Sequence, residues 1–307
     1  MPNDSFDSFK QQLLADLQGS FPANTQISVG SYSHNNCLSL YGLTILEPGS
    51  NISPTIYLEE FFQQYQHGVS LPEICRQIVQ HYSLRRFTNK IDTSFFTCLD
   101  KVRPQIAYKL IHYQRNRDIL PDIPHFAYLD LAIVFYCLVP GFAQENASIL
   151  IHNSHLNLWG ISKDSLLLFA QQNTPRLLPW NCDSLANLLF PGRTKLPYSG
   201  QENPAPPADD AMPMYVLTNK QCLFGACCIL YPDVLQEISQ NLADDLYILP
   251  SSIHEIILIP SSFIENPHSL CEIVREVNLT EVAQDEILSD SIYFYSHNED
   301  SVSRLTF

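Results

Sequence analysis

The spacing of apolar side chains in the first third of the chain changes from helical to strand-like and back. Residues 6–17 place apolar side chains at every third or fourth position, the period of an amphipathic helix. Residues 26–46 then largely alternate between apolar and polar, and turn-forming residues 47–51 follow them. The predicted elements are helix 6–17, antiparallel strands 26–33, 37–46 and 56–58, and helices 59–67 and 72–82.

The remainder of the chain shows a second set of helical and strand-like patterns. Val102, Ile106 and Leu110 fit one face of a helix that spans residues 91–114 and restarts at Pro104. Two apolar runs after it predict a hairpin. The further expected elements are hairpin strands 128–138 and 148–151, helix 165–173 capped by Ser162, short helix 187–190, strand 214–218, helical segments 225–230 and 234–242, strands 246–249 and 255–259, helix 270–278 and strand 292–295.

These elements predict an α+β fold with small antiparallel or mixed sheets flanked by helices. A chain of 307 residues is long enough for two modest units, which we expect at residues 1–125 and 126–307. Within the second unit, residues 192–213 carry five prolines and few aliphatic side chains, so they can bury little surface. We expect this segment to be a loop or mobile linker.

The charge balance limits the classes of partner. The chain has 17 Lys and Arg against 32 Asp and Glu, a formal net charge of −15, which repels nucleic-acid phosphates and anionic lipids. The longest apolar stretch, 129–139, is shorter than the roughly 20 residues that a bilayer span needs. The first residues also lack the basic and apolar regions of a secretory signal. We expect a cytoplasmic protein that binds neither nucleic acid nor membrane.

The nine cysteines are scattered without a regular interval, as reduced core thiols are. His152 and His155 come nearest to a pair of metal ligands, but the paired cysteines of a structural zinc site are missing. We therefore expect no disulfide, no metal and no cofactor. His152 and His155 remain candidates for binding.

Ser252, His254 and Glu255 bring a hydroxyl, an imidazole and a carboxylate together between two apolar strands. These are the residue types of a hydrolase. Neighbouring strand residues point to opposite faces, however, and the Gly-x-Ser-x-Gly turn is absent. We expect a hydrogen-bonded hairpin turn here, with catalysis as the alternative.

Three further polar residues are candidates for binding. Asp130 stands at the entrance to an apolar strand, where an unpaired carboxylate is costly, and Arg176 or Lys109 is the partner we expect. Asn219 lies between a strand and a helix, where backbone amides can hold a phosphate. The glycine-rich motifs of phosphate sites are absent. The added candidates are Asp130, Arg176 and Asn219.

Segments spread over nearly the whole chain carry a family likeness. They are Gly42–Gly49, Pro54–Glu59, Leu129–Tyr136, His152–Gly160, Asn173–Leu177, Tyr215–Asn219, Leu249–Glu255 and Leu288–Tyr293. Together they resemble the domain-of-unknown-function family numbered 5688, found in clostridial and related gut bacteria. The resemblance implies a bacterial accessory protein, for example one of mobile elements, and supplies no catalytic residue, cofactor or substrate.

We expect a non-enzymatic protein-binding or regulatory module. The acidic charge, the 15 tyrosines and the lack of a recognisable catalytic motif favour a protein partner. The alternatives are a hydrolase-like enzyme that uses Ser252, His254 and Glu255, and a small-ligand sensor. A deep concave site that gathers His152, His155 or His254 would favour an enzyme or a sensor, whereas a flat tyrosine-rich patch would favour a partner.

Overall fold

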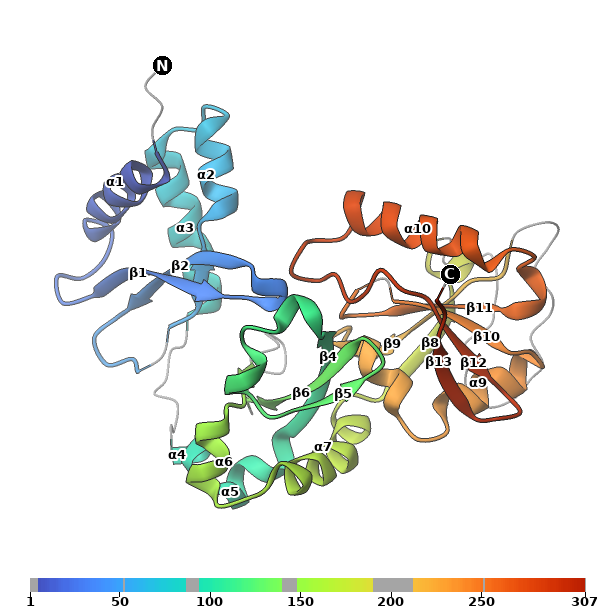
Figure 1. The fold of residues 1–307 in the computed structure, drawn as a ribbon. Coiled ribbons are helices and arrows are strands. Elements are labelled where there is room, and N and C mark those ends of the chain that lie inside the picture. Colours follow the sequence, from blue (N-terminus) through green and yellow to red (C-terminus); the bar gives the residue numbers. More distant parts are fainter. Residues whose placement is uncertain are drawn as a thin grey trace. The chain divides into compact units, whose positions relative to one another are not determined.

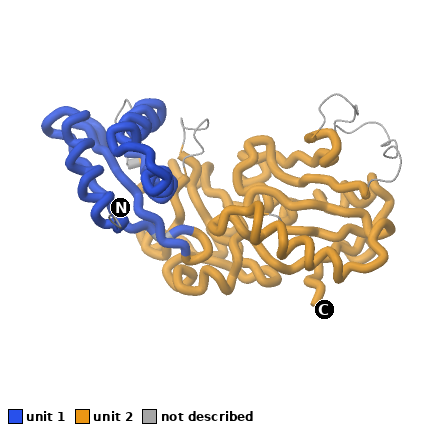
Figure 2. Tube along the Cα trace, turned by 90° about the horizontal axis from the view of Figure 1, so that it is seen from above, with its two compact units in different colours: residues 1–34, 38–94 blue, residues 35–37, 95–307 orange. Residues whose placement is uncertain are grey.

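The computed structural model describes residues 5–51, 53–86, 94–139, 148–189, 212–250 and 252–306. Helices and small antiparallel sheets build an α+β fold, as predicted (Figure 1). The chain divides into two compact units, residues 1–34 with 38–94 and residues 35–37 with 95–307 (Figure 2). The division differs from the expected 125/126 because the strand that follows residue 105 pairs within the second unit.

Unit 1 follows the predicted order of elements. The sheet order is β1-β2-β3, and the helices pack their apolar side chains on one face of it. Phe9, Leu13 and Leu17 are fully buried there, as the helical spacing predicts. The Ser5 hydroxyl caps the first helix by accepting the backbone N–H of Ser8. The elements are α1 Phe6–Gln18, β1 Gln26–Ser33, β2 Ser39–Leu46, β3 Thr55–Tyr57, α2 Glu59–Gln66 and α3 Leu71–Arg85.

Unit 2 begins where the sequence prediction is wrong. Only α4 (Ser94–Thr97) and α5 (Leu99–Val102) are α-helical, and after the 3-10 turn Arg103–Gln105 the chain becomes strand β4, Ile106–His112. The expected helix 91–114 is therefore wrong beyond Gln105. Five of the seven β4 residues are apolar or aromatic, and the same five are buried, so the alternation that marks a strand is lost.

Strand β4 belongs to a four-stranded antiparallel sheet. Its order is β4-β6-β5, with β7 paired to β6, and the β6–β7 hairpin is the one predicted. The expected strand 128–138 is divided by a tight turn at Leu129, whose φ is 54°. Helix α7 packs on β4, where the Thr174 hydroxyl accepts the backbone N–H of Tyr108. The strands are β5 His125–Tyr128, β6 Leu131–Leu138 and β7 Ser148–Leu150, preceded by the 3-10 turns Gln114–Asn116 and Leu120–Asp122.

The helices after this sheet lead into a six-stranded antiparallel sheet of order β13-β12-β10-β11-β9-β8. Ser162 caps α7 as predicted, and Pro175 lies in the last turn of that helix. The edge strands β8 and β13 were not predicted because their residues are largely polar. The elements are α6 Asn153–Trp159, α7 Lys163–Leu177, β8 Trp180–Ser184, α8 Leu185–Leu189, β9 Tyr215–Asn219, the 3-10 segment Gly225–Leu230, α9 Val234–Leu242, β10 Leu246–Leu249, β11 Ile256–Pro260, the 3-10 turn Ser261–Phe263, α10 Pro267–Thr280, β12 Tyr293–Ser296 and β13 Ser301–Arg304.

Two further expectations meet the structure only in part. Most of the proline-rich segment 192–213 lies outside the described residues, so its expected mobility stays a prediction. All nine cysteines are free thiols, and burial raises the pKa of Cys137, Cys182 and Cys227 to about 12.

Among the described helices, none is both long and apolar enough to cross a membrane.

Candidate functional site

Asp130 lies in the tight turn between β5 and β6. The preceding residue, Leu129, has the left-handed backbone conformation that closes the turn. The carbonyl oxygen of Asp130 accepts the backbone N–H of Tyr113, 3.0 Å away, at the end of β4. The backbone around Asp130 is thereby fixed from two sides, which sets the position of its carboxylate.

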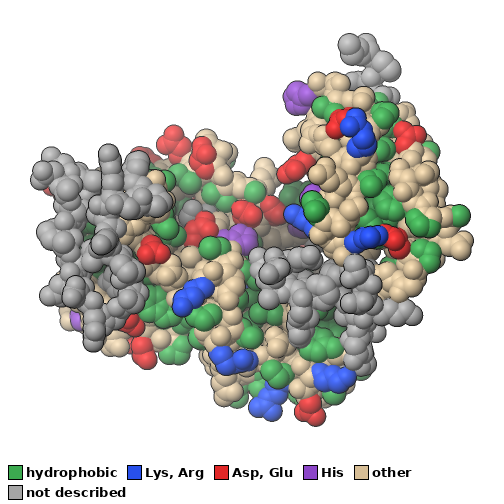
Figure 3. Space-filling view, turned by 180° about the vertical axis from the view of Figure 1, so that it is seen from behind, with side chains coloured by type: hydrophobic (Ala, Val, Ile, Leu, Met, Phe, Trp, Pro, Cys, Tyr) green, Lys and Arg blue, Asp and Glu red, His purple; other side chains and the backbone are tan. Residues whose placement is uncertain are grey.

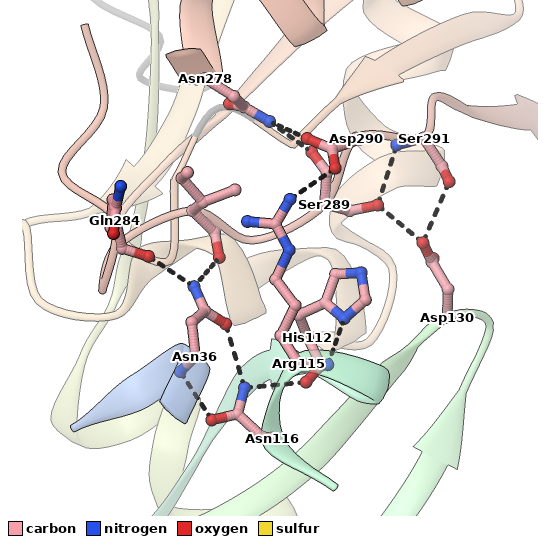
Figure 4. A network of polar contacts seen from close by, with 11 residues as sticks. Asn36, His112, Arg115, Asn116, Asp130, Asn278, Gln284, Ser289, Asp290 and Ser291 are labelled. Atoms are coloured by element: carbon pink, nitrogen blue, oxygen red, sulfur yellow. Dashed lines mark hydrogen bonds and ion pairs between the residues drawn. The ribbon is translucent and has the colours of Figure 1, made fainter. Parts of the chain in front are cut away.

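Three hydroxyl groups hold the Asp130 carboxylate. Ser289 and Ser291 donate to Oδ2 at 2.7 and 3.0 Å (Figure 4), and Tyr293 donates to Oδ1 at 2.7 Å. The expected partners are wrong. Arg176 donates instead to the carbonyl oxygen of Pro104 at 2.8 Å, and the half-buried Lys109 ammonium lies 4.0 Å from the centre of the Phe224 ring.

The hydrogen bonds decide the charge state of Asp130. Burial raises the pKa of this carboxyl, but the hydroxyl groups of Ser289, Tyr293 and Ser291 lower it by more, and the pKa lies below its ordinary value. Asp130 is therefore ionised at neutral pH. Its negative charge is stabilised by neutral hydroxyl donors, and no described cation lies within ion-pair distance of it.

A second set of contacts holds the segment that supplies these hydroxyls. The Asn278 side-chain amide, on α10, donates to the carbonyl oxygen of Ser289 and to Asp290 Oδ1, both at 2.9 Å. Arg115 forms an ion pair with Asp290 Oδ2 at 2.5 Å. The Ser291 backbone N–H donates to Ser289 Oγ at 2.9 Å. Figure 4 shows these groups converging, so the donors to Asp130 are positioned in advance.

His112 lies at the end of β4, close to the same carboxylates. Its Nδ1 accepts the backbone N–H of Arg115 at 3.1 Å, which places the proton of the neutral ring on Nε2. Burial and the positive charge of Arg115 lower the pKa of His112, although Asp130 and Asp290 oppose the shift. The ring is therefore neutral at physiological pH and offers an Nε2–H donor.

Asn116 ties the residues after β4 to the tripeptide 35–37 of unit 2. Its side-chain amide donates to the carbonyl oxygen of His112 at 2.8 Å, and its Oδ1 accepts the Asn36 backbone N–H at 2.8 Å. The Asn36 amide in turn donates to the carbonyl oxygens of Gln284 and Ile287, each at 2.8 Å (Figure 4). Asn36 adopts a φ of 61°, which asparagine tolerates better than most residues.

The groups around Asp130 line a recess of about 460 Å³. This volume is within the usual range for small-ligand sites. Besides Asp130, Asp290 and His112, the lining includes Arg275 from α10 and Arg304 from β13. Both guanidinium groups belong to exposed residues, and within the described part of the chain neither forms an ion pair. The recess thus presents charges of both signs.

The Ser252 hydroxyl is committed to a structural contact. It donates to Glu255 Oε1 at 2.8 Å and accepts the His254 backbone N–H at 3.0 Å, and Ser252 is only 3% exposed. The His254 ring stacks on Phe224, and its Nδ1 lies 3.2 Å from the Phe224 backbone nitrogen. These contacts form a hydrogen-bonded turn in which the Ser252 hydroxyl binds Glu255 and the His254 ring binds the segment around Phe224.

The other candidates are separate from the recess. His155 Nδ1 accepts the His152 backbone N–H at 2.9 Å, and its ring stacks on Trp159. The buried Asn219 side chain accepts the backbone N–H groups of Gln221 and Leu223 and so fixes its own loop. Among the described residues, no group of three or more His, Cys, Asp or Glu side chains is arranged to hold a metal ion.

Of the residues that line the recess, only Asp130 was singled out from the sequence. Arg275, Arg304 and His112 stand singly, in no recognisable motif. The segment Leu288–Tyr293 gave the one usable signal, because two serines and a tyrosine alternate with other residues just before and within a strand, which directs them to one side.

Fold and recess together define an α+β protein of two compact units, the second of which carries a charged, ligand-sized recess. Residues 6–297 match the model of DUF5688, a family of unknown function, and the chain belongs to that family. No curated protein and no solved structure matches the chain.

Proposed function

We propose that this protein is a non-enzymatic regulatory module of the cytoplasm that binds a small ligand in the recess of unit 2 and acts on another protein. The observation that carries the proposal is the coexistence in the recess of an ionised Asp130 and the unpaired guanidinium groups of Arg275 and Arg304. Charges that form no ion pair with a described residue are available to a ligand.

The construction of the recess supports binding rather than stability as its role. Burying part of a carboxylate costs free energy, and the protein offsets that cost with hydroxyl donors that leave the negative charge in place. An ion pair with Arg275 or Arg304 would have neutralised Asp130 instead. Preorganised groups of this kind lower the cost of binding a ligand.

The contacts of Ser252 support a structural role, and not a catalytic one, for the segment that contains Ser252, His254 and Glu255. A serine hydrolase needs a hydroxyl that donates to the imidazole of its base. Here the Ser252 hydroxyl donates to Glu255, and the His254 ring contacts Phe224 and the carbonyl oxygen of Cys222. The hydrolase therefore ranks below the binding module.

The distribution of charge supports a protein rather than a nucleic acid as the macromolecular partner. The chain carries a net charge of −15, and on the face shown in Figure 3 the Lys and Arg side chains lie singly among other residues. A nucleic-acid site needs several neighbouring cations to neutralise phosphates.

A thermal-shift screen tests the proposed function. The probes are amino acids, dicarboxylates, sugar phosphates and polyamines, applied to the wild type and to a double variant, Arg275→Gln with Arg304→Gln. We expect at least one class of probe to raise the melting temperature of the wild type, because a ligand that binds only the folded state stabilises it. The same class should lose most of this effect in the double variant. Arg117→Gln, which changes an exposed arginine paired with Asp118 outside the recess, is the matched control. The proposal fails when no class raises the melting temperature, or when the rise is the same in the double variant.

A further inference from the structure

The two arginines of the recess come from elements that hold them near Asp130. Arg304 lies opposite Tyr293 in the β12–β13 ladder, so both side chains lie on the same face of the sheet. Arg275 lies on α10 one turn before Asn278, the residue that holds Ser289 and Asp290. Guanidinium groups donate in a planar fork that matches a carboxylate or a phosphate. The arginines therefore suit an anionic group of the ligand, and the charge of the remaining lining decides between the two.

Asp130 is the carboxylate of the recess that pairs with no described cation. Its hydrogen bonds come from neutral donors, which are the hydroxyls of Ser289, Ser291 and Tyr293 and its own backbone N–H. Asp290 is less available, because Arg115 and Asn278 each bind one of its oxygens. Asp130 lines the recess, and its neutral hydrogen-bond partners leave its negative charge in place. A charged amine is the donor that gains most from this charge.

We infer that the recess binds a zwitterion of the amino-acid class, with its carboxylate at Arg275 and Arg304 and its ammonium group at Asp130. This inference rests on the proposed function and specifies its ligand. The neutral ring of His112, which also lines the recess, adds an Nε2–H donor. Each charged end of the ligand then meets a charge of opposite sign.

The balance of charge argues against ligands of a single sign. Arg275 and Arg304 line the recess together with Asp130 and Asp290, so its charged lining residues carry two charges of each sign. A phosphate dianion would meet two aspartates, and a polyamine would meet two unpaired guanidinium groups. Like charges brought together in this way cost free energy. A ligand that carries both signs avoids the cost.

Isothermal titration calorimetry tests the inference with probes that separate the two charged groups. L-Alanine, γ-aminobutyrate and the dipeptide alanylalanine carry an ammonium and a carboxylate at different separations. Propionate lacks the amine, ethylamine lacks the acid, and inorganic phosphate is the anionic alternative. We expect at least one zwitterion to bind at least tenfold more tightly than propionate, ethylamine and phosphate. The pair Arg275→Gln and Arg304→Gln should weaken that zwitterion at least tenfold, whereas Arg117→Gln should not.

The outcomes separate this inference from the proposed function. Phosphate, propionate or ethylamine binding as tightly as every zwitterion, with loss in the arginine variants, overturns the zwitterion and leaves a binding recess. No binding by any zwitterion, together with a different class that passes the thermal-shift screen, also overturns the zwitterion alone. Absence of binding in both experiments overturns both. Asp130→Asn supplies an independent check, since it should weaken the zwitterion and should not weaken propionate, which loses a like charge in this variant.

Discussion

Tyr293 on β12 donates its hydroxyl proton to Asp130, in the β5–β6 turn, over a distance of 2.7 Å. The two residues belong to different sheets of unit 2. The contact therefore connects the six-stranded sheet to the four-stranded sheet through a charged group, and it makes the position of Asp130 depend on the packing of both.

Tyr293→Phe removes this donor and keeps the aromatic ring. Tyr293 is fully buried, and a hydrogen bond to a charged acceptor contributes about 1.5–3 kcal/mol. We expect the free energy of unfolding, measured with urea, to fall by roughly that amount. Tyr128→Phe is the control, because no hydrogen bond to a described residue uses that half-buried hydroxyl. Equal stability of wild type and Tyr293→Phe would mean that the contact contributes nothing.

Asp130 should make the stability depend on pH in the acidic range. Its pKa is lower in the folded than in the unfolded state, so the unfolded state binds more protons between the two values. The stabilisation is present above the unfolded pKa of about 3.9 and is lost as the pH falls through the folded value. Urea unfolding at a series of pH values should show a shallower acid loss for Asp130→Asn than for the wild type. The exposed Asp100→Asn is the control, and parallel curves for all three proteins would refute the prediction.

Lys109 should make the stability of the fold depend on pH in the alkaline range. Burial lowers the pKa of this lysine to about 8, even though its ammonium lies over the Phe224 ring. The native state thus releases its proton before the unfolded state does, and stability rises with pH above about 8 from this group. Lys109→Met should remove that contribution, whereas Lys101→Met at an exposed position should keep it. The test is the unfolding midpoint in urea between neutral and mildly alkaline pH. An unchanged pH dependence in Lys109→Met would contradict the assignment.

Gly225 is required by close packing. A Cβ at this position would lie 2.5 Å from the carbonyl oxygen of His254 and 2.8 Å from the backbone nitrogen of Asn219, besides meeting the Thr218 hydroxyl. Gly225→Ala should lower the free energy of unfolding by roughly 1–3 kcal/mol or more, because this is the cost typical of overpacking. At Gly19 the nearest atom would be 3.7 Å away, so Gly19→Ala should be neutral or stabilising in the same thermal-melting assay. Equal melting temperatures for the two variants would show that the loop around Gly225 adjusts freely.

Ser252 should not react with a serine-directed fluorophosphonate. Its hydroxyl is buried and donates to Glu255, so Ser252→Ala should lower the melting temperature while the wild type remains unlabelled in mass spectrometry. Labelling of Ser252 that disappears in a folded His254→Ala variant would restore the hydrolase.

The sequence predicted those features whose contacts are close together along the chain, and it failed where the contacts are distant. Unit 1 was predicted because the contacts that define its helices and strands are local and leave a period in the sequence. Strand β4 was mistaken for a helix because its residues are mostly buried, so alternation is lost. Asp130 was recognised as a carboxylate beside an apolar strand, but its partners are 159–163 residues away. Only the pairing of strands in three dimensions brings Ser289, Ser291 and Tyr293 to it.

The most direct test of the charged recess as a ligand site is NMR spectroscopy of the arginine Nε–H groups in ¹⁵N-labelled protein, titrated with the zwitterion that binds most tightly. Spectra of Arg275→Gln and Arg304→Gln assign the two signals of interest, and Arg117 serves as the internal reference. Our account predicts that the Arg275 and Arg304 signals shift together and saturably, with the Arg117 signal unchanged. Saturable binding that leaves both recess arginines unshifted would contradict it.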